Sequence, residues 1–354
     1  MEKLKILMIG PDRSVHGGIS GVVNNFYAAG LAEKVDLTYV GTMVDGSKIR
    51  KLFQAIKAYI RFCMKLPHSD IVHVNMASDV SYYRKSVFIR TAYMFHKKII
   101  IHQHGGDFQT FYYKELSEKG QKRVDYVLRM GDAFLVLAPV WKDFFSYMVD
   151  FEKITVFPDG IELPEPFEKQ YGQHKILFLG RLCKEKGLCE LFRSVPALKK
   201  AYPNVQIYLG GVWEDQELKA EAEQYADTIT WLGWISGEEK QKYLRECDIF
   251  VLPSYFEGQS LSLLEAMASY CAVVASETGG IPQMVIEGET GILVRPKDAG
   301  SLEDGLLKLL KDSDLCRRIG INARRKVEKE FDISISVSKL AEIYERVYGS
   351  HGKI

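Results

Sequence analysis

The sequence lacks the short patterns that would assign its chemistry at once. It contains no G-x-G-x-x-G fingerprint, no G-x-x-x-x-G-K-[ST] phosphate loop and no C-x-x-C pair. The first absence argues against a nicotinamide-dependent oxidoreductase, which needs that fingerprint and an acidic residue about 20 positions later. The six cysteines are scattered, and several fall in apolar segments, so we expect reduced core residues and a cytoplasmic protein.

Long apolar runs are also missing. The first residues, "MEKLKILMIG", hold an apolar run too short for a signal peptide, and no later run has the length of a membrane-spanning helix. Charge is nearly balanced at +1 overall but unevenly distributed, because residues 48–98 carry 11 basic and 2 acidic side chains. We therefore expect negatively charged partners to be drawn to this basic segment.

Short aliphatic runs alternate with helix-length segments along the whole chain. "KILMIG", "DIVHVN" and "KIIIHQHG" are examples from the first half, and "KILFLGR", "DIFVLPS" and "AVVAS" from the second. Continuous apolar runs indicate parallel strands buried on both faces. The pattern predicts two tandem doubly wound α/β domains, at 1–160 and 161–330, and a helix within 331–354 that packs back on the first domain. We expect ligands in the cleft between the domains, at the carboxyl ends of the strands.

Two loops that follow predicted strands could bind phosphate. Gly17 and Gly18 open a helix after the first strand, where bare backbone amides can approach an anion, although a glycine pair also fits a plain tight turn. Arg181 and Lys186 lie in "FLGRLCKEKGL" and could hold neighbouring phosphates, unless they are only solvated charges.

Two glutamates flank the start of another predicted helix, in "FEGQSLSLLEAMASYC". Glu257 belongs to the loop after a strand, and Ser262-Leu-Leu-Glu265 fits a capping box at the helix start. Both carboxylates could then accept hydroxyl groups of one sugar ligand, while the helix amides face phosphate. The alternative is that Glu265 only completes the capping box and Glu257 is a turn residue.

Histidines follow a strand of the first half in "IHQHGGDF". His102 and His104 could suggest a metal, but no Cys or Glu partner at a fixed spacing supports one. The two glycines after His104 allow its backbone to lie against a ligand. The only D-x-D, Asp312-Ser313-Asp314, is interpreted as a helix N-cap rather than a magnesium site.

Taken together and in this order, these segments resemble the retaining glycosyltransferases of family 4, which have the two-domain GT-B fold and use nucleotide sugars. The resemblance covers nearly the whole chain and is most specific in "GRLCKEKGL", "PSYFEGQSLSLLEAMA", "TGGIPQMV" and "GETGILV". It implies a catalytic set of Arg181, Lys186, Glu257 and His104. It implies a donor-binding set of Gly17, Gly18, Gly180, Gly258, Gln259, Ser260, Leu261 and Glu265.

The resemblance also assigns roles. Glu257 would touch the donor sugar, Glu265 would hold the ribose hydroxyls, and His104 would lie beside the transferred sugar. Arg181, Lys186 and the helix amides would stabilise the diphosphate leaving group, so no metal or other cofactor is expected. The sequence departs from the family at Asp159, where relatives have Asn, at Cys271, where they have Gly, and at Gln283, where they have Glu. We expect the first two changes to affect only local turn geometry.

The acceptor side is predicted from "KIRKLFQAIKAYIRFCMKL". It places one apolar stripe on a helix with cations flanking it: Ile49, Leu52, Phe53, Ile56, Tyr59, Ile60, Cys63 and Met64. Such a stripe usually faces the protein's own core. Even so, the cations of 48–98 favour peripheral attachment to the inner, anionic face of a membrane and a lipid-linked glycan acceptor. Nothing in the spacing supports nucleic-acid binding.

Other functions fit the same fold. A sugar-nucleotide epimerase or a glycan phosphorylase would share the two domains, and a non-catalytic protein would bind the nucleotide sugar without releasing nucleotide. The joint presence of Arg181, Lys186 and the paired glutamates favours a working transferase.

Overall fold

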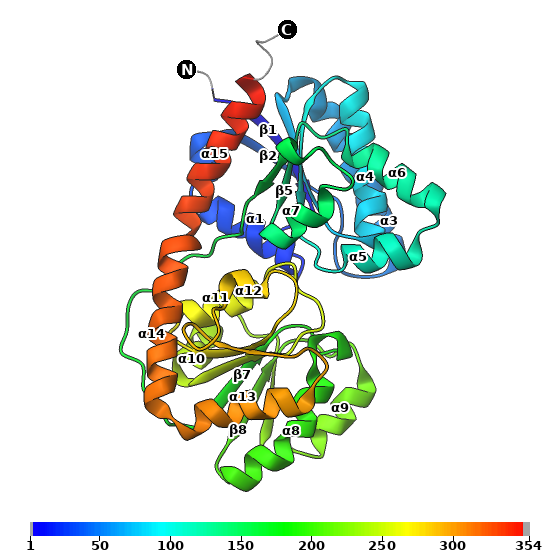
Figure 1. Cartoon of the computed structure of the whole chain (residues 1–354). Helices are drawn as coiled ribbons and strands as arrows, with labels where there is room; N and C mark the ends of the chain where they lie inside the picture. The colour runs from blue at the N-terminus through cyan, green and yellow to red at the C-terminus, as the bar shows by residue number, and fades with distance from the viewer. Residues whose placement is uncertain (1–2, 350–354) are drawn as a thin grey trace. The chain divides into compact units, whose positions relative to one another are not determined.

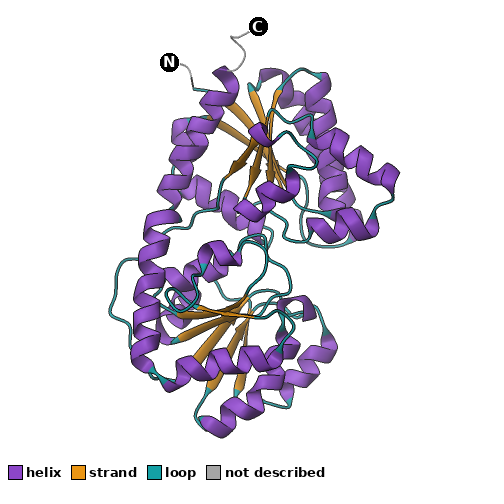
Figure 2. Cartoon of the chain, viewed as in Figure 1, coloured by secondary structure: helices purple, strands orange, loops and turns teal. Residues whose placement is uncertain are grey.

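The computed structural model describes residues 3–349, and these fall into two compact units. Unit 1 combines residues 1–162 with 332–354, and unit 2 spans residues 163–331. Residues 1–2 and 350–354, at the ends of the predicted segments 1–160 and 331–354, lie outside the described residues. Each unit contains a parallel six-stranded sheet with helices on both faces, so the predicted doubly wound α/β class is confirmed (Figures 1 and 2).

The sheet of unit 1 has the strand order β2-β1-β3-β4-β5-β6. Its central strands β3 and β4 have no exposed residue and are rich in aliphatic side chains, which explains why they were recognisable in the sequence, although each also buries polar residues. The strands are β1 (Lys5–Gly10), β2 (Asp36–Gly41), β3 (Ile71–Met76), β4 (Lys98–Gln103), β5 (Ala133–Val136) and β6 (Ile154–Val156).

The helices of unit 1 connect these strands and cover both faces of the sheet. They are α1 (Gly18–Ala28), α2 (Leu31–Lys34), α3 (Lys48–Lys65), α4 (Asp79–Met94), α5 (Phe108–Thr110), α6 (Glu118–Leu128), α7 (Pro139–Phe145) and α15 (Ile333–Gly349). Helix α15 begins after Asp332, whose carboxylate accepts a hydrogen bond from the Ser334 amide, so Asp332 caps the helix. Helix α15 contacts α1 and α2, although these helices lie about 300 residues earlier in the sequence.

The sheet of unit 2 has the order β12-β11-β10-β7-β8-β9, which is the Rossmann arrangement. The edge strand β9 leaves Trp231 exposed, whereas the central strands β7, β10 and β11 are buried. The strands are β7 (Lys175–Leu179), β8 (Gln206–Gly210), β9 (Ile229–Gly233), β10 (Ile249–Leu252), β11 (Ala272–Ser276) and β12 (Ile292–Val294).

The helices of unit 2 are α8 (Leu188–Ala201), α9 (Gln216–Glu223), α10 (Gly237–Glu246), α11 (Leu261–Ala268), α12 (Ile281–Met284), α13 (Ala299–Lys311) and α14 (Ser313–Glu330). Asp312 caps α14 by accepting a hydrogen bond from the Leu315 amide. The predicted N-cap interpretation of the D-x-D sequence is therefore confirmed.

Candidate functional site

The strand order of unit 2 places two of the predicted loops side by side. Because β7 leads to β8 on one side while β10 pairs on its other side, the order reverses between β7 and β10. Ligands of open α/β sheets bind at such a switch point, outside the carboxyl ends of the strands. The loop 180–187 leaves β7 there, and the loop 253–260 leaves β10.

Hydrogen bonds fix these loops to each other. The Tyr255 amide donates to the Glu185 carbonyl at 2.8 Å and joins the two loops, whereas the Gly280 amide, from the loop after β11, donates to the Glu257 carbonyl at 3.2 Å. Gly187 adopts φ +74°, and a Cβ there would lie 2.0 Å from the Pro253 carbonyl oxygen. Only glycine therefore lets the two loops approach this closely.

Lys186 and Glu257 meet across the two loops. The Lys186 Nζ lies 2.5 Å from Glu257 Oε1, with the side chains 18% and 9% exposed. A lysine ammonium has three donors, so this contact leaves it capacity for other acceptors. The predicted cation and the predicted sugar-binding carboxylate thus belong to one largely buried site.

Arg181 has a different environment. Its Nη1 donates to Glu214 Oε2 at 2.9 Å, and the two side chains are 60% and 46% exposed. In this structure the two cations predicted to act together are held by separate carboxylates.

Helix α11 starts two residues earlier than the capping-box prediction requires. Its N-cap is Ser260, whose hydroxyl accepts a hydrogen bond from the Leu263 amide, and Ser262 donates to the Leu179 carbonyl instead. The predicted capping box from Ser262 to Glu265 is therefore wrong. The predicted donor residues Gly258, Gln259, Ser260 and Leu261 form the entry to this helix. Gly180 lies directly after β7.

Glu265 does not take part in a capping box and instead forms an ion pair with Lys240, which the sequence analysis did not identify. Lys240, on α10, donates to Glu265 Oε1 at 2.8 Å, and both side chains are about one quarter exposed. No short motif contains Lys240. Its place beside Glu265 results from tertiary packing alone.

Cys271, the second departure from the family, is buried behind α11. Its Sγ lies 3.1 Å from the Lys169 Nζ, and the ammonium also donates to the Leu244 and Ser269 carbonyls. The thiol therefore takes part in a buried contact rather than only shaping a turn, so the expectation of a purely local effect is wrong.

In unit 1, Gly17 and Gly18 stand where the sequence predicted, at the start of α1 after β1. The strand order of this sheet reverses between β1 and β3, so α1 begins at the switch point. A Cβ at either glycine would meet no atom within 4 Å. The helix start is therefore open, and no neighbouring group requires glycine at these positions.

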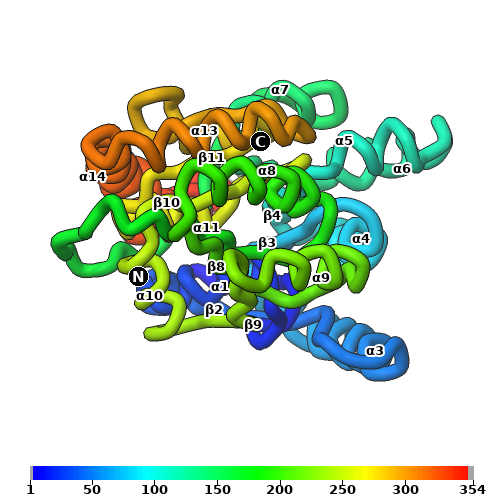
Figure 3. Tube along the Cα trace, turned by 90° about the horizontal axis from the view of Figure 1, so that it is seen from below, coloured from blue at the N-terminus to red at the C-terminus, as the bar shows by residue number. Residues whose placement is uncertain are grey.

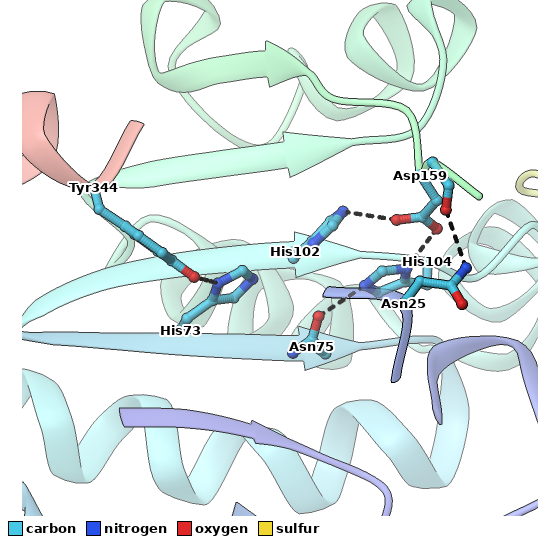
Figure 4. A network of polar contacts seen from close by, with 8 residues as sticks. Asn25, His73, Asn75, His102, His104, Asp159 and Tyr344 are labelled. Carbon is cyan, nitrogen blue, oxygen red and sulfur yellow. Dashed lines mark hydrogen bonds and ion pairs between the residues drawn. The ribbon is translucent and has the colours of Figure 1, made fainter. Parts of the chain in front are cut away.

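His104 lies at the carboxyl end of the same sheet and is held at both ring nitrogens. Its Nδ1 is 3.2 Å from Asp159 Oδ2, and its Nε2 is 2.9 Å from Asn75 Oδ1 (Figure 4). Asp159 also approaches the His102 Nε2 at 3.8 Å. The expectation that aspartate at position 159 affects only turn geometry is wrong, because its buried carboxylate contacts two histidines. His102, His104 and Asp159 are also the one group of described residues whose ligand atoms lie close enough to hold a metal, within 4.8 Å of one another.

A second pair of buried groups continues from these histidines. His73 Nδ1 shares a 2.6 Å hydrogen bond with the Tyr344 hydroxyl of α15. Burial, with a smaller contribution from His104, lowers the pKa of His73 to about 3. Burial likewise lowers the pKa of His102 and raises that of Tyr344. These groups are therefore neutral near pH 7.

The apolar stripe of α3 does not face the core. Helix α3 lies beside α4 (Figure 3), and its buried residues are Ala58 and Phe62. The ring of Phe62 packs against that of Phe88 of α4, with ring centroids 5.0 Å apart. The opposite face is exposed at Ile49, Leu52, Phe53, Ile56, Ile60 and Met64. The expectation that this stripe packs on the protein's own core is wrong. None of the helices within residues 3–349 is both long and apolar enough to cross a membrane.

The basic segment 48–98 is not wholly on the surface. Lys85 is buried and its Nζ donates to the Thr42 hydroxyl at 2.6 Å, and desolvation lowers its pKa. Exposed cations on the two helices include Arg50, Lys51, Lys57, Arg61, Lys65 and Arg90.

The chain is similar to known proteins in sequence and in structure. Residues 161–326 match the model of the family "Glycosyl transferases group 1". A phosphatidyl-myo-inositol mannosyltransferase of Mycobacterium tuberculosis is 31% identical over 185 residues, which is 51% of this chain and 49% of that protein. The chain thus spans about half the length of this curated relative.

Solved structures match over both units. Sucrose-phosphate synthase from Thermosynechococcus elongatus has a TM-score of 0.82 at 20% identity, covering 98% of this chain and 100% of that one. Anabaena HepE, in complex with UDP and glucose, has a TM-score of 0.79 at 15% identity, with 97% and 100% covered. These likenesses establish the fold. The chain has the GT-B fold, and its residues 161–326 are similar to glycosyl transferases group 1.

Proposed function

We propose that the chain is a retaining, metal-independent glycosyltransferase that moves a sugar from a nucleotide-diphosphate sugar to a glycan acceptor. The observation that carries this proposal is the meeting of Lys186 and Glu257 at the switch point of unit 2, beside the start of α11. An ammonium and helix amides suit a diphosphate, and a carboxylate suits sugar hydroxyls. The group 1 match over 161–326 supports the same assignment.

Cleavage of the bond between the anomeric carbon and phosphate leaves negative charge on the diphosphate. Lys186 and the first amides of α11 would stabilise that negative charge. Arg181 would stabilise it further after breaking its exposed ion pair with Glu214. Positive charge develops on the sugar at the same time, and Glu257 would hold the sugar hydroxyls. The acceptor would attack from the side that the diphosphate leaves, which retains the anomeric configuration.

Glu265 would accept the ribose hydroxyls of the nucleotide. The Lys240 Nζ donates to Glu265 Oε1 at 2.8 Å and so orients this carboxylate. Because HepE was solved with UDP and glucose, UDP-glucose is a sensible first donor for this chain. The base and the sugar are left to the assay.

The assay is incubation with UDP-, GDP- and ADP-linked sugars, with and without EDTA, followed by measurement of the released nucleotide. We expect slow release from one donor, unaffected by EDTA, and the same anomeric configuration in the product by NMR. Binding of a donor without release would indicate a non-catalytic protein. Conversion of labelled donor into another nucleotide sugar would indicate an epimerase, and release that depends on inorganic phosphate would indicate a phosphorylase.

We further propose that α3 attaches unit 1 to the anionic inner face of a membrane, where a lipid-linked glycan is the acceptor. The support is the exposed stripe: Ile49 and Phe53 are each 69% exposed and Leu52 is 62% exposed. Exposed cations flank it at Lys57, Arg61 and Lys65. An amphipathic helix of this composition binds by burying its apolar face at the lipid interface while cations meet anionic headgroups.

Vesicle sedimentation tests this attachment. We expect co-sedimentation with vesicles of anionic phospholipid, and loss of it in the variant Leu52→Ser/Phe53→Ser. The variant Tyr147→Ser removes an equally exposed side chain of unit 1 outside α3 and should bind normally. For charge, Lys57→Glu/Arg61→Glu should release the protein, whereas Arg317→Glu/Arg318→Glu on α14 makes the same change in net charge and should not. Equal binding by all variants would contradict the proposal.

A further inference from the structure

Tyr255, in the loop after β10, is bound through both its backbone and its side chain to the start of α8 and the loop before it. Its amide donates to the Glu185 carbonyl at 2.8 Å. Its hydroxyl donates to the Glu190 carboxylate and lies 3.0 Å from Oε1 and 2.9 Å from Oε2. Two separate contacts therefore fix Tyr255, which stands two positions before Glu257.

Glu190 is a buried carboxylate in the first turn of α8. The residue is 5% exposed, and α8 starts directly after Gly187. Burial of a carboxylate is unfavourable unless hydrogen bonds compensate for the lost water, and the Tyr255 hydroxyl supplies such a bond. The amides at the helix start also favour negative charge there. Burial, and then the contact with Glu190, raises the pKa of Tyr255, so its hydroxyl keeps the proton that it donates.

The two contacts of Tyr255 bracket Lys186 in the sequence. Glu185 lies directly before Lys186, and Glu190 follows it by four positions, at the start of a helix. On the opposite loop, Glu257 follows Tyr255 by two positions. The 2.5 Å contact between Lys186 Nζ and Glu257 Oε1 therefore depends on where Tyr255 and Glu190 hold the two segments.

The ring and the carbonyl of Tyr255 have partners as well. Lys297, after β12, places its Nζ 4.9 Å from the Tyr255 ring centroid and 5.9 Å from that of Phe256, and a cation over an aromatic face is attracted to it. The Tyr255 carbonyl accepts a hydrogen bond from the Thr278 hydroxyl at 3.1 Å. The side chain thus has one partner at its hydroxyl and another at its face, so it cannot rotate far without losing a contact.

A contact that serves stability alone is the competing explanation. Phenylalanine at 255 and leucine at 190 would fill similar space without burying a charge, and such apolar replacements of buried polar pairs are often neutral or stabilising. Apolar contacts have no preferred direction, whereas a hydrogen bond has a preferred length and angle. The contact between Tyr255 and Glu190 therefore specifies the relative position of the two segments more closely than an apolar contact would.

We propose that Tyr255 and Glu190 are positioning residues, which keep Lys186 and Glu257 at the separation that cleavage of the donor requires. They act through these two side chains and not on the substrate itself. A misplacement of about 1 Å in a catalytic site can lower the rate about 100-fold. The inference deepens the proposed function, on which it rests, by extending the site from the two loops into the first turn of α8.

Turnover and nucleotide affinity together test this role. Tyr255→Phe should lower turnover of the active donor by about 10- to 100-fold. In calorimetry it should change the affinity for UMP, GMP or AMP, whichever matches that donor, by less than about twofold, because the ribose contact proposed for Glu265 lies on α11 beside Lys240. Tyr171→Phe removes another hydrogen-bonded hydroxyl of unit 2 and should keep both values. Turnover within about twofold of the wild type, or an equal loss of turnover and affinity, would overturn the proposal.

Urea unfolding separates positioning from packing. Tyr255→Phe removes the hydroxyl from a buried carboxylate, so unit 2 should unfold at a lower urea concentration. The double variant Tyr255→Phe/Glu190→Leu also removes the buried charge and should recover most of this shift, while its turnover stays low. Glu190→Gln keeps an acceptor for the Tyr255 hydroxyl and should retain at least about a third of the wild-type turnover.

The double variant decides the question even if Tyr255→Phe does not fold. Recovery of both stability and turnover in the double variant would show a packing role and would overturn the proposal. A Glu190→Gln variant that turns over as slowly as the double variant would overturn it too, because the retained acceptor would then have no effect on the reaction.

Hydrogen exchange gives a readout that does not depend on activity. In the full chain, the amides of 180–187 and 253–260 should exchange at least about threefold faster in Tyr255→Phe than in the wild type, and at the wild-type rate in Tyr171→Phe. Unchanged exchange in both loops would show that the contact does not hold them and would overturn the inference. Faster exchange confined to these loops, in a chain that releases no nucleotide from any donor, would leave the contact standing and refute the proposed function alone.

Discussion

Removal of Arg181 or Lys186, the two predicted phosphate-binding cations, should strongly lower turnover. Only the removal of Lys186 should also lower the free energy of unfolding of unit 2. Lys186 and Glu257 are 2.5 Å apart with side chains 18% and 9% exposed. Breaking a fully buried pair costs about 3–5 kcal/mol, because one charge stays buried without compensation. Since some exposure remains here, we expect Lys186→Ala to lower the free energy of unfolding by about 2 kcal/mol.

Arg181 gives the contrasting case. Its pair with Glu214 is 60% and 46% exposed, and such surface pairs contribute about 0–1 kcal/mol. Arg181→Ala should therefore leave stability nearly unchanged. Both substitutions should lower turnover by about two to three orders of magnitude, because each removes a donor to the developing charge. Lys184→Ala, which changes another exposed cation of the same loop, serves as the control and should keep both properties.

Urea unfolding followed by tryptophan fluorescence measures the difference. Trp213, Trp231 and Trp234 all lie in unit 2, so a Trp141→Phe background makes the signal report on that unit. The double variant Lys186→Ala/Glu257→Ala should recover about 1 kcal/mol of the loss, because no uncompensated charge remains, while staying inactive. Equal destabilisation by Arg181→Ala and Lys186→Ala, or strict additivity in the double variant, would refute the reasoning.

Three further predictions concern single sites. Glu265→Ala should weaken binding of free nucleotide in calorimetry, and Lys240→Ala should do so to a smaller extent, because it acts only through the carboxylate; unchanged affinity in both would remove the ribose role. Gly187→Ala should destabilise unit 2 by about 2 kcal/mol or more, since φ +74° and the Pro253 carbonyl both oppose a Cβ; a wild-type urea midpoint would contradict this. His73 has a folded-state pKa of about 3, below its ordinary value of 6.5, so its contribution to stability is present above pH 6.5 and is lost as the pH falls toward 3. Between pH 6 and 5 this loss is about 1.2 kcal/mol of the free energy of unfolding. In His73→Gln, the free energy of unfolding from urea titrations should fall by about that much less between these two pH values, and an unchanged pH dependence would show that His73 titrates normally.

The fold could be predicted because buried parallel strands leave a direct trace in the sequence. Strands such as β3 and β4 are buried on both faces, so their aliphatic residues stand close together in the sequence and separate them from amphipathic helices. The position of Asp332 and Asp312 before helices was equally local information. Such features depend on neighbours in the chain, and the sequence contains them.

The candidate site could be predicted only in part. Glu257, Lys186 and the start of α11 lie in short motifs, but Lys240 reaches Glu265 from a separate helix. Asp159 was noticed as a departure from the family, yet its contact with His104 joins residues 55 positions apart. Such contacts follow from strand order and loop packing, which a single sequence does not specify.

The α3 stripe was misjudged for a different physical reason. Both faces of this helix offer apolar residues: Ala58 and Phe62 on one side, and the longer stripe from Ile49 to Met64 on the other. Periodicity reports that a helix is amphipathic but not which apolar face meets the protein. The face with Ala58 and Phe62 is the buried one, and Phe62 packs there against Phe88 of α4.

The return of α15 to unit 1 sets an order of assembly during synthesis. Unit 2 is one uninterrupted stretch, whereas unit 1 needs residues from both ends of the chain. Until the last helix leaves the ribosome, His73 has no Tyr344 to bond, and the turn at Gly160 has no helix to pack on. A nascent chain stalled just before residue 333 would therefore carry a first unit that lacks α15 beside a second unit that can already be native. Loss of α15 would therefore destabilise elements made early in synthesis, because α15 contacts α1 and α2 and its Tyr344 bonds His73 of β3.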